Sequence, residues 1–411
     1  MSIPALDQRG GIFTLTWLPE KLVATISRIS QQKDRVPCEV TFTTTAPGYS
    51  PHIWHTNPNL IAGTTFGRIA KTLAKKYPRI TEDEADAIIE QLSVLVLKAY
   101  RQGEEAIELS SETDIDITKQ EYKIEPLIIA GAPNLFFGDG GVGKSTLGVL
   151  FAVMIQLPWE ENPLGMKVTH GRVLYLDWEG DKLGIAKRLK SIIRGAGMEF
   201  GLDFTYRRCF MPLMDDIEAI QKLVLERNID TVIIDSLGYA CNRDLAVPET
   251  ATSIHNCIRS LNVTSIIFHH ISKDKRVKKE TPFGSVYFRN SCRMAWNVKK
   301  SQEKDSPVMD IMLKHDKGND VMNLPAVGIR ITFDEGKRII SKAKISEMPE
   351  FAAEASIPNQ IRDLLTEGAK SITEISQRIG KNDAYARAVL SRMKLDGQVV
   401  KIGRSEWGLS I

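Results

Sequence analysis

The chain has 411 residues, more than a single domain usually contains, so two or three domains are expected. Its 54 lysines and arginines nearly balance 51 aspartates and glutamates, and a net charge of +3 excludes any argument for nucleic-acid binding from overall charge. Five scattered cysteines without zinc spacing indicate reduced thiols, and the absence of a signal peptide or a bilayer-length apolar run predicts a cytoplasmic protein without membrane contact.

Residues 1–110 are predicted to form an α+β domain whose role the sequence does not indicate. Apolar and polar residues alternate as in half-buried strands in two segments, 12–17 and 39–45. The segment 19–32 between them carries a weak helical pattern. A helix is predicted at 65–76, and a longer helix with one apolar stripe should follow the capping box of Thr81 and Glu84.

Two features of this domain could contact a partner. A basic run could touch nucleic acid, although such runs are more often solvated faces: Lys71, Lys75, Lys76 and Arg79. Three residues are placed in a loop that could bind a ligand, although a packed aromatic loop is the simpler interpretation: His52, Trp54 and His55. An acidic stretch poor in apolar residues follows and predicts a linker at 111–123.

The motif G-x-x-x-x-G-K-[ST] occurs once, between a short apolar strand and a predicted helix. Glycines let backbone N–H groups turn inward toward phosphates, and the following helix presents its positive end. We expect Lys144 to reach the β- and γ-phosphates and the Ser145 hydroxyl to ligate Mg²⁺. The predicted nucleotide-binding residues are Gly138, Asp139, Gly140, Gly141, Val142, Gly143, Lys144, Ser145 and Thr146.

Three later apolar runs end in polar residues, as expected of parallel strands whose carboxyl ends meet a ligand. The first ends near Glu179, which could orient the attacking water or could cap the following helix. The second ends at Asp235, which is placed to hold Mg²⁺ through water as a Walker B acid. The third ends at His269 and His270, where an imidazole can sense the γ-phosphate.

The phosphate loop, Leu-Tyr-Leu-Asp-Trp-Glu-Gly, Ile-Ile-Asp-Ser and Phe-His-His-Ile-Ser-Lys follow one another in this order. Together they resemble the RecA-like ATPases, above all the RepA-type hexameric replicative helicases and related AAA-annotated ATPases of phages and plasmids. The resemblance predicts an ATPase core at 124–344. It implies that Glu179 is the catalytic glutamate, Asp235 the Walker B acid and His270 the sensor.

In rings of this family the nucleotide lies between subunits, and the neighbour supplies cations to the transition state. Gly284 and Ser285 match part of the family's Arg-Gly-Ser stretch, but Phe283 stands where its arginine would be. The resemblance therefore leaves several candidates for the cation that acts on the neighbouring subunit. We favour Arg293 and Lys317 over Arg289 and Lys314.

Two loops match the positions that line the channel of such rings, 237–250 and 273–280. The second is strongly basic and suits the phosphates of single-stranded DNA, although a solvated loop is the alternative. Its cations are Lys273, Lys275, Arg276, Lys278 and Lys279.

A connector at 345–356 precedes a predicted module at 357–411. Three helices, the second opened by the capping box of Ser371 and Glu374, and a hairpin turned at Gly403 and Arg404 resemble a winged helix-turn-helix. Many such modules bind protein; on duplex DNA, the facing residues would be Lys381, Asn382, Tyr385, Arg387, Arg392, Lys401 and Arg404.

The predicted fold class is α/β, a RecA-like P-loop NTPase core with an N-terminal α+β domain and a C-terminal winged helix-turn-helix. The predicted function is that of a hexameric replicative DNA helicase that hydrolyses ATP with Mg²⁺ and moves on single-stranded DNA. One alternative is an ATP-controlled DNA-binding switch or loader that unwinds nothing. Another is a KaiC-like remodelling or signalling ATPase, against which the basic loop argues.

Overall fold

The computed structural model describes residues 2–9, 11–102, 120–157, 159, 161–198, 201–272, 280–319, 321–348, 351, 357–403 and 406–410. The chain divides into two compact units, of which the first holds the N-terminal sheet and helices together with Asp215–Lys222, and the second holds the rest. No helix within these described ranges is long and apolar enough to cross a bilayer. Most of the predicted linker and connector lies outside them.

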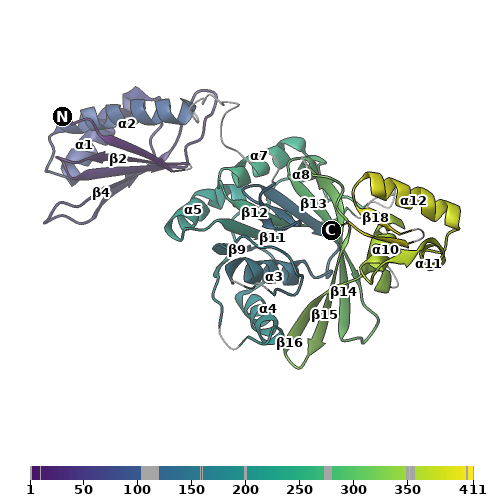
Figure 1. Ribbon diagram of the computed structural model, residues 1–411. Coiled ribbons are helices and arrows are strands. Elements are labelled where there is room, and N and C mark those ends of the chain that lie inside the picture. The colour runs from purple at the N-terminus through teal and green to yellow at the C-terminus, as the bar shows by residue number, and fades with distance from the viewer. Residues whose placement is uncertain are drawn as a thin grey trace. The chain divides into compact units, whose positions relative to one another are not determined.

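The N-terminal sheet has five antiparallel strands in chain order, and two helices cover one of its faces (Figure 1). The strands bury every second side chain, for example Phe13, Leu15 and Trp17. The elements are β1 (Ala5–Arg9), β2 (Ile12–Trp17), β3 (Leu22–Ser27), β4 (Glu39–Thr44), β5 (His52–Thr56), the 3₁₀ turn η1 (Gly63–Thr65), α1 (Phe66–Lys76) and α2 (Glu82–Gln102).

The sequence predictions for this domain were partly wrong. The expected helix at 19–32 is the strand β3, which pairs with β2 and β4 and buries Leu22, Ala24 and Ile26. The expected loop at His52 is the edge strand β5. The capping box at Thr81 is confirmed, since the Thr81 N–H donates to the Glu84 carboxylate at 2.8 Å.

A nine-stranded sheet forms the centre of the second unit, in the order β10-β9-β11-β12-β8-β13-β14-β15-β16. Pairing is parallel from β10 to β13 and antiparallel beyond. The strands are β8 (Pro133–Gly138), β9 (Val173–Asp177), β10 (Thr205–Arg208), β11 (Thr231–Asp235), β12 (Thr264–His270), β13 (Met294–Ser301), β14 (Val308–Gly318), β15 (Val327–Asp334) and β16 (Lys337–Ala343).

Helices lie on both faces of this sheet (Figure 1), so its inner strands are buried on both sides and read as continuous apolar runs. The small hairpin of β6 (Tyr122–Ile124) and β7 (Ile128–Ile129) precedes it. The helices are α3 (Lys144–Gln156), α4 (Lys182–Gly195), α5 (Leu213–Glu226), α6 (Leu237–Ala240), α7 (Pro248–Arg259) and α8 (Tyr287–Asn290).

The register of the parallel strands brings their carboxyl ends to one edge. His270 lies opposite Gly138, and Asp235 lies opposite Asp177. The loops that follow these four strands therefore start side by side, as the sequence predicted from the strand pattern.

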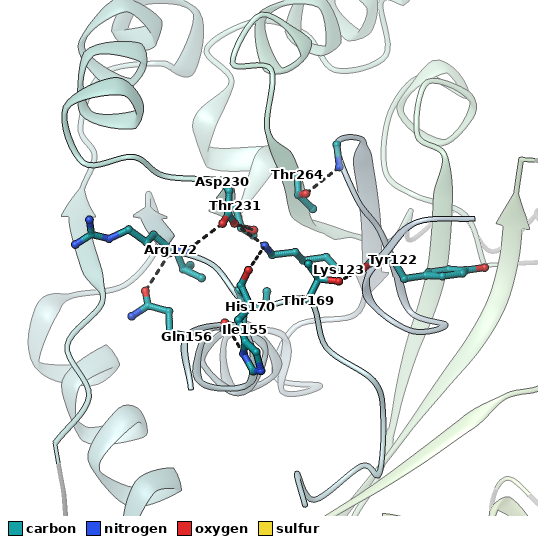
Figure 2. A network of polar contacts seen from close by, with 12 residues as sticks. Tyr122, Lys123, Ile155, Gln156, Thr169, His170, Arg172, Asp230, Thr231 and Thr264 are labelled. Carbon is teal, nitrogen blue, oxygen red and sulfur yellow. Dashed lines mark hydrogen bonds and ion pairs between the residues drawn. The ribbon is translucent and has the colours of Figure 1, made fainter. Parts of the chain in front are cut away.

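A network of polar contacts lies at the opposite edge of the sheet, where the parallel strands begin (Figure 2). The Lys123 ammonium, almost fully buried, pairs with Asp230 at 2.7 Å and donates to the His170 carbonyl at 3.2 Å. Asp230 also accepts from the Arg172 N–H and the Thr231 hydroxyl. The network joins β6 to the starts of β9 and β11, so it fixes where those strands begin and hence where they end.

The C-terminal region has its own small core around Ile361, Leu390 and Trp407. The predicted capping box is present, with the Glu374 N–H donating to the Ser371 hydroxyl at 3.2 Å. A two-residue strand that the sequence analysis missed pairs with the hairpin. The elements are the 3₁₀ turn η2 (Ile345–Glu347), α10 (Ile357–Leu365), β17 (Lys370–Ser371), α11 (Ile372–Arg378), α12 (Asp383–Leu395), β18 (Val399–Ile402) and β19 (Glu406–Leu409).

Candidate functional site

The loop from Gly138 to Gly143 joins β8 to α3 in a shape that requires glycine. Gly141 and Gly143 have φ of 72° and 95°, which L side chains rarely adopt. A Cβ atom on Gly138 would lie 2.4 Å from the Val298 carbonyl oxygen, so this glycine permits the close approach of β13. The N-terminal end of α3, with its free N–H groups, begins directly after the loop.

The Lys144 ammonium folds back over the loop. It donates to the carbonyl oxygens of Gly138 at 3.0 Å and Asp139 at 2.8 Å. Burial lowers the pKa of Lys144, and the carboxylates of Glu179, Asp235 and Asp139 oppose that shift. Lys144 is therefore a cation held among acids, in reach of an anion that enters the loop.

Asp235 ends β11 with its side chain buried beside the loop. Burial raises the pKa of this carboxyl, while the hydroxyls of Ser145 and Tyr175 act against the rise. The Tyr175 hydroxyl donates to Asp235 Oδ2 at 2.7 Å. The sequence analysis did not identify Tyr175, although a tyrosine within an apolar strand signals a buried hydroxyl that needs a partner.

Asp235 Oδ1 is buried and has no hydrogen-bond partner among the described residues. A buried carboxylate oxygen without a partner is costly unless a cation or a donor reaches it. Carboxylate and hydroxyl oxygens are the donors that Mg²⁺ prefers. The side chains of Asp235 and Ser145 therefore have the chemistry that a magnesium ion requires, and their role as its ligands stays a prediction.

The loop after β9 places Glu179 next to these groups. The Ser236 hydroxyl donates to Glu179 Oε2 at 2.9 Å, and His270 Nε2 lies 3.5 Å from the same oxygen. Glu179 does not cap α4, because that position is taken by Asp181, which accepts from the Gly184 N–H. The Glu179 side chain is 42% exposed and so remains open to water.

The two histidines at the end of β12 have different surroundings. His270 faces Glu179, whereas His269 is buried with Nε2 2.8 Å from the Phe283 carbonyl oxygen. Burial lowers the pKa of His269 to about 4. The Phe283 N–H in turn donates to the His270 carbonyl, so the end of β12 is joined to the segment before α8.

A second buried histidine, His255 of α7, continues this contact. The Phe288 ring of α8 lies between the two imidazoles, at 5.3 Å from His269 and 6.0 Å from His255. Burial lowers the pKa of His255 to about 4 as well. Ring packing through Phe288 therefore also connects β12, α7 and α8.

Three of the four candidate cations lie at the other edge of the sheet, whereas the register places the exposed Lys314 level with Phe137, near the end of β8. The Arg293 N–H donates to the carbonyl of Pro133, the first residue of β8, which is roughly 16 Å from Gly138 at about 3.3 Å per residue. Lys317 donates to three carbonyls of its own chain, those of Arg289, Asn290 and Cys292. Arg289 is bonded to Asp316. None of these three is close to the phosphate loop of its own chain.

The candidate nucleic-acid residues are only partly described. The basic residues at 273–279, namely Lys273, Lys275, Arg276, Lys278 and Lys279, and also Arg404, lie outside the described residues. The predicted loop at 237–250 contains α6 and the start of α7. Exposed positions on or next to α12 and β18 hold Lys381, Asn382, Tyr385, Arg387, Arg392 and Lys401.

Parts of the chain are similar to known proteins. Residues 104–276 match a family model described as an AAA domain, a range that contains the phosphate loop, Glu179, Asp235 and His270. Among solved structures, the chain matches the KaiC-like protein PH0186 of Pyrococcus horikoshii OT3 with 14% identity and a TM-score of 0.38, over 55% of this chain and 99% of that one. Residues 104–276 are therefore similar to an AAA-type ATPase domain, and the large, mostly parallel sheet of the second unit fits a RecA-like P-loop core.

Two glycines of the loop offer a matched test. Gly143→Ala should abolish nucleotide binding, since its φ of 95° is unfavourable for alanine by about 1–2 kcal/mol and its Cβ would lie 2.8 Å from Ile311 Cδ1. Gly140→Ala should bind nearly as wild type, because a Cβ there meets no protein atom within 4 Å. Titration with a fluorescent ATP analogue measures both, and equal affinities would contradict the account.

The buried histidines predict acid sensitivity. The unfolded chain takes up protons on His255 and His269 below about pH 6.5, whereas the folded chain does so only near pH 4. Stability should fall between these values, by up to about 1.4 kcal/mol per pH unit for each histidine. In the His255→Leu variant, the midpoint of unfolding should decrease less steeply as the pH is lowered. His52→Leu, on the exposed start of β5, is the control, and an unchanged slope in the His255 variant would refute the argument.

Proposed function

We propose that the AAA domain of this chain hydrolyses ATP and couples hydrolysis to movement along single-stranded DNA, as a hexameric helicase in replication. The observation that carries the proposal is the position of Glu179. This carboxylate is oriented by the Ser236 hydroxyl and His270, is open to water, and lies beside the phosphate loop. A carboxylate so placed can orient a water molecule for in-line attack on a γ-phosphate.

The chain's own residues account for phosphate binding. The loop glycines present backbone N–H groups, and Lys144 exchanges its two carbonyl partners for the β- and γ-phosphates. Ser145 and Asp235 would hold Mg²⁺, which when bound neutralises charge on the phosphate oxygens. Burial of Lys144 strengthens its attraction to phosphate, because less water screens the charge.

His270 is proposed to sense the γ-phosphate. Its imidazole lies 3.5 Å from Glu179 and its carbonyl accepts from the Phe283 N–H. A shift of Glu179 on hydrolysis would therefore move His270 and, through it, the segment between residue 279 and α8. The bound nucleotide would in this way affect the conformation of the proposed DNA-binding loop.

The position of Arg293 supports assembly of several copies. Arg293 directly precedes β13 at the edge remote from the phosphate loop of its own chain, so we propose that it assists hydrolysis at the site of another copy. Lys317, the other candidate favoured from the sequence, donates to three carbonyls of its own chain. We propose Arg293 as the finger that acts on a neighbouring copy, and a closed ring as the assembly.

The C-terminal region is proposed to be a winged helix-turn-helix that binds duplex DNA. It has three helices and a hairpin, and its third helix, α12, exposes polar and basic side chains. Tyr385 and Arg387 are the described residues on α12 best placed to enter a groove, with Lys381 just before the helix.

Turnover and unwinding test the proposal. Glu179→Gln should lower ATP turnover by about 10²–10⁴-fold, because it removes the group that orients the water, and Lys144→Ala should abolish it. Glu303→Gln, at an exposed position of the same unit, should leave turnover unchanged. Single-stranded DNA should raise wild-type turnover, and the protein should separate a forked duplex only with ATP.

The outcomes also separate the alternatives. Turnover that DNA stimulates without any strand separation would replace the helicase by an ATP-controlled switch or loader. Turnover indifferent to DNA would contradict both nucleic-acid functions.

A further inference from the structure

Helix α1 of the N-terminal domain carries a basic face that the proposed ATPase mechanism does not use. Its inner side packs on the sheet through Ile69, Ala70 and Leu73. Its outer side exposes four cations at helical spacing, and the helix contains no acidic residue. These residues, named the α1 basic face, are Arg68, Lys71, Lys75 and Lys76.

The cations of the α1 basic face make no ion pair with any described residue, in contrast to Arg28, which pairs with Glu39 in the same domain. Arg68 and Lys71 are three residues apart, and Lys71 and Lys75 are four apart, so like charges face each other along the helix. Such pairs destabilise a helix by a few tenths of a kcal/mol each. A bound polyanion would relieve this repulsion.

The shape of the α1 basic face also suits an extended anion. A shallow hollow lies along it, lined by the four cations with Gly67 and Thr72. Gly67 leaves the hollow open, since a Cβ there would meet no atom within 4 Å. From Arg68 to Lys76 the face spans about 12 Å at 1.5 Å per residue, which is longer than a single phosphate group requires.

An exposed aromatic side chain lies near the C-terminal end of α1. Tyr49, which is 38% exposed, packs edge-on against the buried Tyr77, the residue that follows α1, with ring centroids 5.0 Å apart. Lys75 and Lys76 immediately precede Tyr77. A row of cations and an exposed aromatic ring on one domain are the two features with which proteins bind single-stranded nucleic acid, because phosphates pair with the cations and bases stack on the ring.

We propose that the α1 basic face, together with Tyr49, binds single-stranded nucleic acid. The site lies in the N-terminal domain and needs neither ATP nor hydrolysis, so it goes beyond the proposed motor function. Through this site the chain stays bound to the nucleic-acid strand at every stage of the ATPase cycle.

The test uses the full chain without nucleotide and a fluorescent single-stranded oligonucleotide. The triple variant Lys71→Ala, Lys75→Ala, Lys76→Ala is compared with Lys33→Ala, Arg35→Ala, Lys98→Ala, which removes the same charge from exposed positions of the same domain. The first should bind at least about tenfold more weakly, with a salt dependence shallower by roughly two counterions. The second should bind as wild type, and circular dichroism checks that both are folded.

Tyr49 tests the stacking part of the proposal. Tyr49→Ala should weaken binding about fivefold, and Tyr49→Phe should restore it, because the ring and not the hydroxyl stacks on a base. A duplex of the same length should bind less tightly than the single strand. Equal binding of duplex, with no effect of Tyr49→Ala, would overturn the assignment to single strands.

Equal loss of oligonucleotide binding in the two triple variants, or no loss in either, would contradict a binding site on the α1 basic face. If the α1 variant binds like its control while DNA still stimulates ATP turnover, only this inference fails. If DNA has no effect on turnover but the α1 variant alone loses binding, the inference holds and the helicase proposal fails.

Discussion

The structure of the candidate site depends on the burial of one carboxylate, that of Asp235. Parallel strands bring Asp235, Asp177 and the phosphate loop to one sheet edge, where the two aspartates are almost fully buried. A buried carboxylate is costly unless donors or cations surround it. Three groups surround the Asp235 carboxylate in this way, namely the hydroxyls of Tyr175 and Ser145 and the Lys144 ammonium. Asp235 Oδ1 has no hydrogen-bond partner among the described residues and is available to a further cation. Two of these stabilising groups, Ser145 and Lys144, are also the residues that we propose bind Mg²⁺ and phosphate.

The same sheet separates two sets of charged groups. The acids and Lys144 gather where the parallel strands end, whereas Arg293 and Lys317 lie where β13 begins and β14 ends. Strand length keeps the two sets apart within one chain, by roughly 16 Å along β8. A site that uses both must therefore be formed by two copies, and the contact of β12, Phe288 and α8 joins the two edges within each copy.

Local chemistry explains what the sequence could predict. The phosphate loop, the capping boxes at Thr81 and Ser371 and the apolar strands that end in acids each depend on residues close in the chain. The helix predicted at 19–32 was wrong because β3 has only six residues. Its extended conformation is decided by pairing with β2 and β4, which a local sequence pattern does not include. The bond from Tyr175 to Asp235 and the pairing of Lys123 with Asp230 join residues 60 or more positions apart, so spacing could not reveal them.

The claim that the site is completed by a second copy is tested most directly by mixing two inactive variants. Lys144→Ala lacks a working phosphate loop but keeps Arg293, and Arg293→Ala keeps the loop but lacks the finger. If Arg293 acts on the neighbouring copy, the mixture should hydrolyse ATP faster than either variant alone, because one variant supplies the cation to the intact loop of the other. Turnover in the mixture equal to the mean of the two variants would contradict the account.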